Sequence, residues 1–97
     1  MPISIALMKL TDQGIKDIKA APQRIEQGIK AFEVMGGKML AFYSVMGEYD
    51  YVAVAESPND EVAMAFLLTL GAQGSVRTTT LRAFTKEQFT KVVKKLP

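Results

Sequence analysis

The sequence predicts an α+β fold, in which four strands form one antiparallel sheet and two helices cover one of its faces. Three observations predict this fold. Apolar residues alternate in segments of strand length, apolar residues recur at helical spacing between those segments, and Gly, Pro and helix-capping residues separate them. Along the 97 residues the segments follow the order β-α-β-β-α-β, with one further helix at the C-terminus.

The first strand is predicted over residues 3–10, ISIALMKL, because its apolar residues alternate. Thr11 follows as a predicted N-cap, and apolar residues then recur three or four positions apart along residues 15–32. Pro22 lies within this stripe and has no N–H to donate, so we expect a kink or break near residues 20–21. Because the stripe is continuous, both halves of the helical segment are expected to cover the same surface.

A β-hairpin is the clearest unit of the sequence. The paired glycines Gly36-Gly37 are predicted to end the preceding helix with a left-handed cap. Strands are then predicted over residues 38–46 and 49–56. Gly47-Glu48 is predicted to join them as a two-residue type II′ turn, which requires a positive φ at its first residue.

This hairpin register places Met46 opposite Tyr49 and Ser44 opposite Tyr51. One face of the hairpin would then carry Leu40, Phe42, Ser44, Met46, Tyr49, Tyr51, Ala53 and Ala55. The opposite face would carry Met39, Ala41, Tyr43, Val45, Asp50, Val52, Val54 and Glu56. Both faces are largely apolar, whereas an antiparallel sheet with one face in water shows one polar face. The sheet is therefore expected to be covered on both sides, by its helices on one face and by a second subunit on the other.

The remaining elements are predicted from their capping residues. Ser57 is the expected N-cap of the next helix, with Pro58 at the first helical position. A Thr-rich strand is predicted over residues 75–84, and Thr85 with Gln88 predicts a capping box at the start of the last helix. The apolar stripe of the last helix spans only about two turns, so a second sheet is expected to cover the open sheet face better than this helix does.

The element order is that of the ferredoxin-like fold, with a four-stranded antiparallel sheet and two helices on one face. No repeat, linker or low-complexity segment interrupts it. We expect one domain over residues 1–97, with a core of about 3–84 and a C-terminal helix of about 85–96.

Composition excludes several classes of function. The chain has no His, Cys or Trp, so a Ser-His-Asp triad, a Cys-His pair, a His- or Cys-ligated zinc site and a His-ligated haem are all excluded. We expect no metal and no cofactor. Residues 1–76 hold six Lys or Arg and nine Asp or Glu, a net charge of −3, while residues 77–97 hold six and one, a net charge of +5. No targeting segment or membrane span is visible, and we expect a cytoplasmic protein.

The hairpin segment Gly47-Glu48-Tyr49-Asp50 resembles the signature of the GYD domain family. Other family motifs occur in the expected order, and the resemblance extends over about residues 3–84. These motifs are Thr11, Gln13 and Gly14 as T-x-Q-G, Pro22 and Arg24 as P-x-R, Gly36-Gly37, Pro58 with Asp60 and Glu61, and residues 74–80 with Ala83-Phe84. The resemblance implies a dimeric α/β barrel, in which two ferredoxin-like sheets pack face to face. This superfamily includes cofactor-free monooxygenases, isomerases, haem enzymes and small-molecule regulatory domains.

The candidate catalytic residues are Asp50 and Tyr43, which share one face in the predicted register. A carboxylate beside apolar neighbours is a candidate general acid or base; alternatively, it accepts hydrogen bonds from the hairpin backbone or pairs with an Arg. Tyr43, Tyr49, Asp50, Tyr51 and Arg77 are the candidate ligand-binding residues. The tyrosines line a pocket or pack in the core. Arg77 binds an anionic ligand or pairs with a surface carboxylate, and the same two alternatives apply to the other arginines of the domain.

Three functions are open at this point. The first is a homo-oligomeric protein that binds a small apolar or weakly acidic molecule between sheet and partner subunit. The second is a cofactor-free enzyme, similar to a monooxygenase or isomerase, that uses Asp50 or a Tyr in proton transfer. The third is a purely structural assembly module. RNA is not an expected partner, because the first strand has no aromatic residue on which a base could stack.

Overall fold

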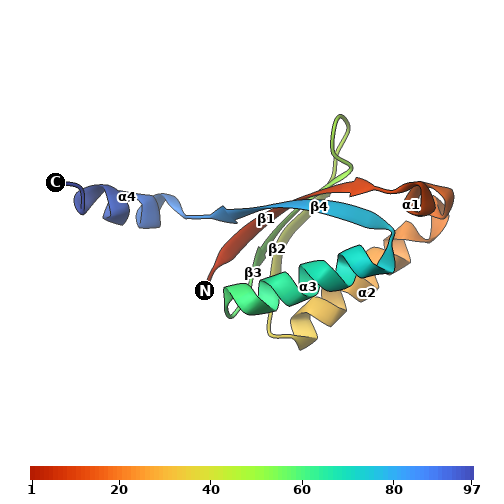
Figure 1. The fold of residues 1–97 in the computed structure, drawn as a ribbon, viewed down its shortest axis with the longest axis horizontal. Helices are drawn as coiled ribbons and strands as arrows, with labels where there is room; N and C mark the ends of the chain where they lie inside the picture. Colours follow the sequence, from red (N-terminus) through yellow and green to blue (C-terminus); the bar gives the residue numbers. More distant parts are fainter.

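The computed structural model describes all 97 residues and confirms the predicted α+β, ferredoxin-like fold (Figure 1). Its elements in chain order are β1 (Ile3–Leu10), α1 (Asp12–Lys16), the 3₁₀ turn η1 (Ile18–Ala20), α2 (Ala21–Val34), β2 (Lys38–Ser44), β3 (Tyr51–Glu56), α3 (Asp60–Gln73), β4 (Val76–Ala83) and α4 (Lys86–Lys94). The four strands form one antiparallel sheet of order β2-β3-β1-β4. Helices α2 and α3 lie on one face of this sheet, and no element of the chain covers the other face (Figure 1).

The helix-covered face holds the core of the domain. Met8 from β1 and Tyr51 and Ala53 from β3 are buried there, and Phe32 of α2 is also buried. Two aromatic pairs connect the layers, with ring centroids 4.8 Å apart for Phe32 and Phe66 and 5.3 Å apart for Phe42 and Tyr51. Residues that pack around this cluster are Ala6, Leu10, Ile25, Met39, Phe42 and Val76. These contacts place α2 and α3 on the side of the sheet that carries Met8 and Phe42.

The uncovered face, called the open face below, is apolar in its centre. Directly opposed residues of an antiparallel pair lie on the same face, so the strand register assigns its members. They are Ile3, Ile5, Leu7, Lys9, Lys38, Ala41, Tyr43, Val52, Val54, Glu56, Arg77, Thr79, Leu81 and Ala83. Tyr43 is 61% exposed and Leu81 is 49% exposed. The prediction that both sheet faces carry apolar residues is therefore confirmed.

A bulge in β2 corrects the predicted faces at two positions. Met39 lies opposite Ala55 while Ala41 lies opposite Val54, so Leu40 is left without a partner between them. An extra residue of this kind changes the alternation of the strand. As a result Met39 faces the helices, where strict alternation predicts Leu40, and Leu40 is 42% exposed.

The hairpin loop is longer than predicted. The pairing of Ser44 with Tyr51 is confirmed, but the pairing of Met46 with Tyr49 is wrong, because the strands end at Ser44 and begin again at Tyr51. Residues 45–50 form a loop that rises on the side of the open face, away from α2 and α3 (Figure 1). Gly47 has the predicted positive φ, at +121°, within this six-residue loop and not in a two-residue turn.

The first helical segment is divided as predicted, but its first part does not cover the sheet. Thr11 caps α1 by accepting from the Gly14 amide at 3.2 Å, and α2 begins just before Pro22. Ile15 and Ile18 are 56% and 44% exposed, so the expectation of one continuous covering stripe is wrong. The short α1 and η1 change direction before α2 starts and lie beyond the end of the sheet (Figure 1).

The N-cap of α3 is Asn59, and the prediction of Ser57 is wrong. The Asn59 Oδ1 atom accepts from the Val62 amide at 2.9 Å. Ser57 is held in the sheet region, because its amide donates to the Pro2 carbonyl at 3.0 Å. The chain therefore needs two more residues before the helix can start.

Helix α4 projects away from the rest of the molecule (Figure 1). The predicted capping box of Thr85 and Gln88 is present. Every residue from 86 to 97 is exposed, so this helix covers no part of its own open face. No helix of the chain has the length and hydropathy that crossing a membrane requires.

Candidate functional site

Asp50 directly precedes β3, and its hydrogen bonds join the hairpin to β1. Its Oδ2 atom accepts from the Leu10 amide at 2.8 Å, and its own amide donates to the Met8 carbonyl at 2.8 Å. The side chain thus takes the place of a strand carbonyl that β3 no longer supplies. This geometry matches the structural alternative for Asp50, although the donor belongs to β1 and not to the hairpin itself.

The rest of the hairpin loop lies beside Lys9 of β1. The Lys9 Nζ atom is 5.4 Å from the centroid of the Tyr49 ring and 3.7 Å from Glu48 Oε1. The side chains of Lys9 and Glu48 are both more than half exposed, so this ion pair contributes little to stability. Tyr49 is half-buried at this end of the sheet.

Tyr43 and Tyr51 lie on opposite faces of the sheet, as the predicted register places them. Tyr43 is exposed on the open face, opposite Val52. Tyr51 is 7% exposed on the helix-covered face, where its ring packs against Phe42. Of the two, only Tyr43 is an exposed residue.

Among the three arginines, Arg77 alone has no carboxylate partner. It is exposed on β4, opposite Lys9, so two cations lie side by side at this end of the sheet. Arg82 donates from Nε to Asp60 Oδ1 at 3.1 Å, and its guanidinium lies 5.4 Å from the Phe84 ring centroid. Surface pairing therefore describes Arg82, and Arg77 remains available to a partner of negative charge.

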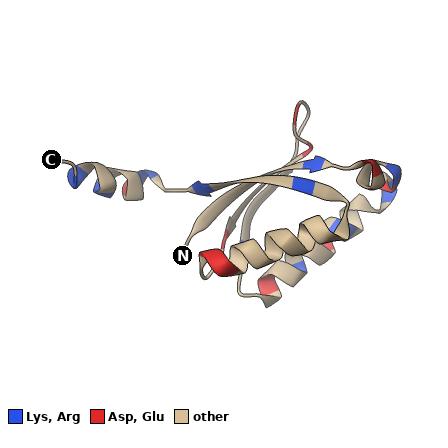
Figure 2. Cartoon of the chain, in the orientation of Figure 1, with Lys and Arg blue, Asp and Glu red and all other residues tan.

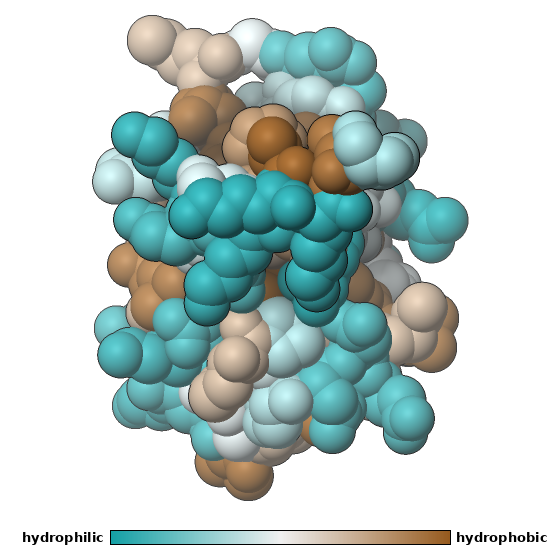
Figure 3. Space-filling model, turned by 90° about the vertical axis from the view of Figure 1, so that its left-hand side faces the viewer, coloured by the Kyte–Doolittle hydropathy of each residue, from teal (hydrophilic) through white to brown (hydrophobic).

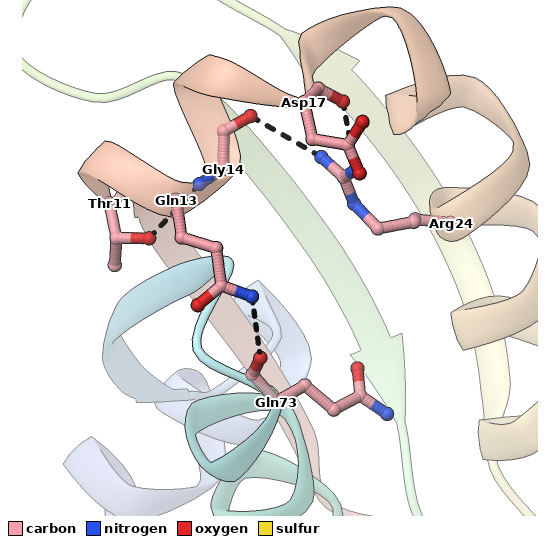
Figure 4. A network of polar contacts seen from close by, with 6 residues as sticks. All are labelled: Thr11, Gln13, Gly14, Asp17, Arg24 and Gln73. Carbon is pink, nitrogen blue, oxygen red and sulfur yellow. Dashed lines mark hydrogen bonds and ion pairs between the residues drawn. The ribbon is translucent and has the colours of Figure 1, made fainter.

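A polar network where α1 meets the start of α2 and the end of α3 accounts for several family motifs (Figure 4). Arg24 donates to the Asp17 carboxylate at 3.1 Å and to the carbonyls of Asp17 and Gly14 at 2.9 and 3.4 Å. Gln13 donates to the Gln73 carbonyl at 3.3 Å, which ties α1 to the end of α3. The T-x-Q-G and P-x-R residues thus hold α1, α2 and α3 together.

The interior offers little room for a ligand. A cavity of ≈ 50 Å³ lies between the sheet and the helices, lined mainly by small and apolar side chains. The hydroxyls of Ser57 and Thr80 line it and make no hydrogen bond. A cavity of this size holds water but not a metabolite. A functional site is therefore expected at the surface.

The outer face of α3 is the surface feature that sequence analysis missed. A surface helix has a polar outer side, yet α3 carries no charged residue after Glu61. Met64 and Leu68 are 59% and 65% exposed there. We define the α3 outer face as Glu61, Met64, Ala65, Leu68 and Ala72. The missing polar positions in DEVAMAFLLTLGAQ were the signal that could have identified it.

Two hollows adjoin the α3 outer face. One of ≈ 530 Å³ lies between α3 and the edge strand β4 and is lined in part by Leu68, Ala72 and Arg77. The second, of ≈ 390 Å³, lies at the start of the helix and is lined by Asp60, Glu61, Met64, Ala65 and Leu68. Apolar area of this kind, bordered by charges of both signs, is typical of protein-binding surfaces.

Comparison with known proteins gives two findings. A family model described as GYD domain matches residues 5–93. A protein of Thermus thermophilus is 37% identical over 84 residues, which cover 86% of this chain and 88% of the relative. That relative is named glutamine synthetase and cystathionine beta-lyase binding protein.

Proposed function

The chain belongs to the GYD domain family, and from this premise we propose that it is a homo-oligomeric protein that binds glutamine synthetase, cystathionine beta-lyase or both. The observation that carries the proposal is the relative at 37% identity, whose name states these two partners. The match covers most of both chains, so the surfaces of the two proteins are expected to be comparable over the whole fold.

The α3 outer face supports a protein partner. It presents Met64 and Leu68 to solvent on the side of the molecule that is opposite to the open sheet face. Association of two copies through their open faces would leave α3 free. The free guanidinium of Arg77 and the carboxylate of Glu61 provide charged positions around the apolar centre.

The open face supports the homo-oligomer. Its centre is formed by aliphatic residues of β1, β3 and β4, and an exposed apolar area of this size is rare on monomers. A second sheet packed on it would bury both copies at once, since a two-fold contact uses the same patch twice.

Binding can be measured directly with purified glutamine synthetase and cystathionine beta-lyase from the organism that encodes this chain. We expect at least one of them to bind the immobilised protein. The Leu68→Glu variant should weaken binding at least about tenfold, since a charge replaces an apolar contact. Val34→Glu is the matched control, because Val34 is 88% exposed on α2, outside the α3 outer face. Absence of binding to both enzymes by the folded oligomer would refute the proposal.

A second candidate function is binding of a small apolar or weakly acidic molecule between the facing sheets. It is favoured by the position of Tyr43, Lys9 and Arg77, which add one hydroxyl and two cations to an apolar open face. Native mass spectrometry of protein purified gently from its own host tests this function, because it detects a retained ligand together with the number of subunits.

A further inference from the structure

Helix α4 has an apolar side that nothing in its own chain covers. Its apolar residues Phe89, Val92, Val93 and Leu96 are 45% to 65% exposed. The helix has nine residues, and isolated helices of that length are marginal in water even when they are capped. A partner that covers the apolar side would therefore stabilise it.

The hairpin loop, residues 45–50, is the second unpartnered apolar element. Met46 is fully exposed and Val45 is 36% exposed. The loop also carries Glu48 and Asp50 and no basic residue. Its surface is thus apolar with a negative charge.

The two elements lie at opposite ends of β1, with the loop on the side of the open face and α4 continuing beyond the end of β4 (Figure 1). Asp50 is bonded to Leu10 at the end of β1, whereas Ala83, just before α4, is paired with Ile3 at its start. The eight residues of β1 separate them by about 23–27 Å. In Figure 1 the loop rises on the open-face side, and Figure 2 shows several charged positions along α4. Seen from its free end, α4 has a hydrophobic group above its hydrophilic row (Figure 3).

Two-fold symmetry brings these two elements together. When two sheets pack through their open faces about an axis perpendicular to β1, the ends of the strand are exchanged between the copies. The α4 of each copy then lies at the same end of the paired sheets as the hairpin loop of the other copy. The contact is made twice, once at each end of the paired sheets.

Charge favours the same pairing. Residues 86–97 hold four Lys and one Glu, a net charge of +3, whereas the hairpin loop has a net charge of −2. On the open sheet face Lys9, Lys38 and Arg77 outnumber Glu56, and Lys9 offsets part of the loop charge through its ion pair with Glu48. We propose that α4 of one copy packs against the hairpin loop of a second copy, so that each subunit holds the other at both ends of the sheet. This inference rests on the proposed assembly through the open face.

Cross-linking tests the contact. The chain has no cysteine, so only the introduced cysteines can react. A Met46→Cys chain and a Val92→Cys chain are mixed at equal concentration and treated with a short bis-maleimide. We expect a cross-linked heterodimer as the main product. Val34→Cys replaces Met46→Cys in the control, since Val34 is similarly accessible but lies on the helix side, and this pair should give little product.

If α4 packs at another position, different cysteine pairs become cross-linked. A main product from Met64→Cys with Val92→Cys would place α4 on the α3 outer face and overturn the inference. A chain with both Met46→Cys and Val92→Cys that links only within itself would overturn it too. Sedimentation of the same samples separates the two proposals: a dimer without the cross-link refutes the α4 contact alone, whereas a wild-type monomer refutes the assembly on which it rests.

Charge reversal adds a matched pair of variants. By helical spacing, Lys86 and Lys95 flank the apolar side of α4, while Lys91 and Lys94 lie opposite it. Lys86→Glu with Lys95→Glu should weaken dimerisation about tenfold, because both new charges meet the acidic loop. Lys91→Glu with Lys94→Glu changes the net charge equally and should have a much smaller effect. Equal weakening by both pairs would contradict a contact through the apolar side.

Discussion

The two faces of the sheet are similar in composition and differ in what covers them. Phe42, Tyr51 and Ala53 lie on one face beneath α2 and α3, and Val52 and Val54 lie on the other with no cover from the chain. The centre of each face is apolar, and on the open face the charged residues Lys9, Lys38, Glu56 and Arg77 lie toward the ends of the strands. The difference teaches that the fold of one chain accounts for only half of its apolar sheet surface. We propose that association of two copies covers the other half.

A charge placed on the helix-covered face tests this distinction with the largest expected effect. Phe42→Lys removes the ring that packs 5.3 Å from Tyr51 and puts an ammonium group beneath α2. The expected loss is about 3–5 kcal/mol of unfolding free energy, from the lost packing and the buried charge. A domain of this size has little more stability than that, so circular dichroism should show an unfolded chain. A variant with native ellipticity and an unchanged melting temperature would contradict the assignment of this face.

The register that separates the faces depends on Asp50. A slip of one residue would exchange every side chain between the two faces. Asp50→Ala leaves the Leu10 amide without its acceptor and should cost about 1–3 kcal/mol. Asp50→Asn keeps an acceptor oxygen and should cost less while the oligomer is retained. Denaturant unfolding with sedimentation checks both variants, and a fully stable Asp50→Asn that has lost enzyme binding would instead assign Asp50 to the binding site.

The sequence was sufficient for the fold because each element carries local signals. Alternation defined residues 3–10, Thr11 capped the first helix, and Pro22 marked the break before α2. The side of the sheet that the helices cover could not be predicted, because both hairpin faces are apolar. The bulge at Leu40 carries no distinctive residue, so its exchange of Met39 and Leu40 was also invisible.

The candidate site was less accessible to sequence reasoning than the fold. Asp50 was a plausible acid or base from its apolar neighbours, but its acceptor role depends on Leu10, forty positions away. Tyr43 and Tyr51 were predicted on opposite hairpin faces, as the structure has them, but the face that the helices cover could not be predicted. The residue pattern of α3 could have revealed its outer face, because Met64 and Leu68 occupy positions where a surface helix is polar.

The turn that closes the hairpin should have an intermediate effect. Gly47 has a φ of +121°, and a Cβ built there would touch no neighbouring atom within 4 Å. Gly47→Val should therefore cost about 1–3 kcal/mol through backbone strain alone. Gly28→Ala is the control, since Gly28 lies within α2 with open space around it, and it should stabilise the protein by about 0.5–1 kcal/mol. An unchanged denaturation midpoint for Gly47→Val would show that the loop relaxes to accommodate a side chain.

A charge on the open face should have the smallest effect on the fold and a decisive one on assembly. Val54 lies in the centre of that face, opposite Ile5 and Ala41, and no helix of its own chain covers it. In the isolated subunit the Lys side chain of Val54→Lys can extend into water, so the fold should change in stability by no more than about 0.5 kcal/mol. In the oligomer the same ammonium group would be buried against a second apolar sheet without a partner. Val54→Lys is therefore expected to give a folded monomer, seen as native ellipticity together with a halved mass in sedimentation equilibrium. A wild-type chain that is already monomeric at micromolar concentration, or a Val54→Lys chain that remains fully oligomeric, would show that the open face is not the surface through which copies associate.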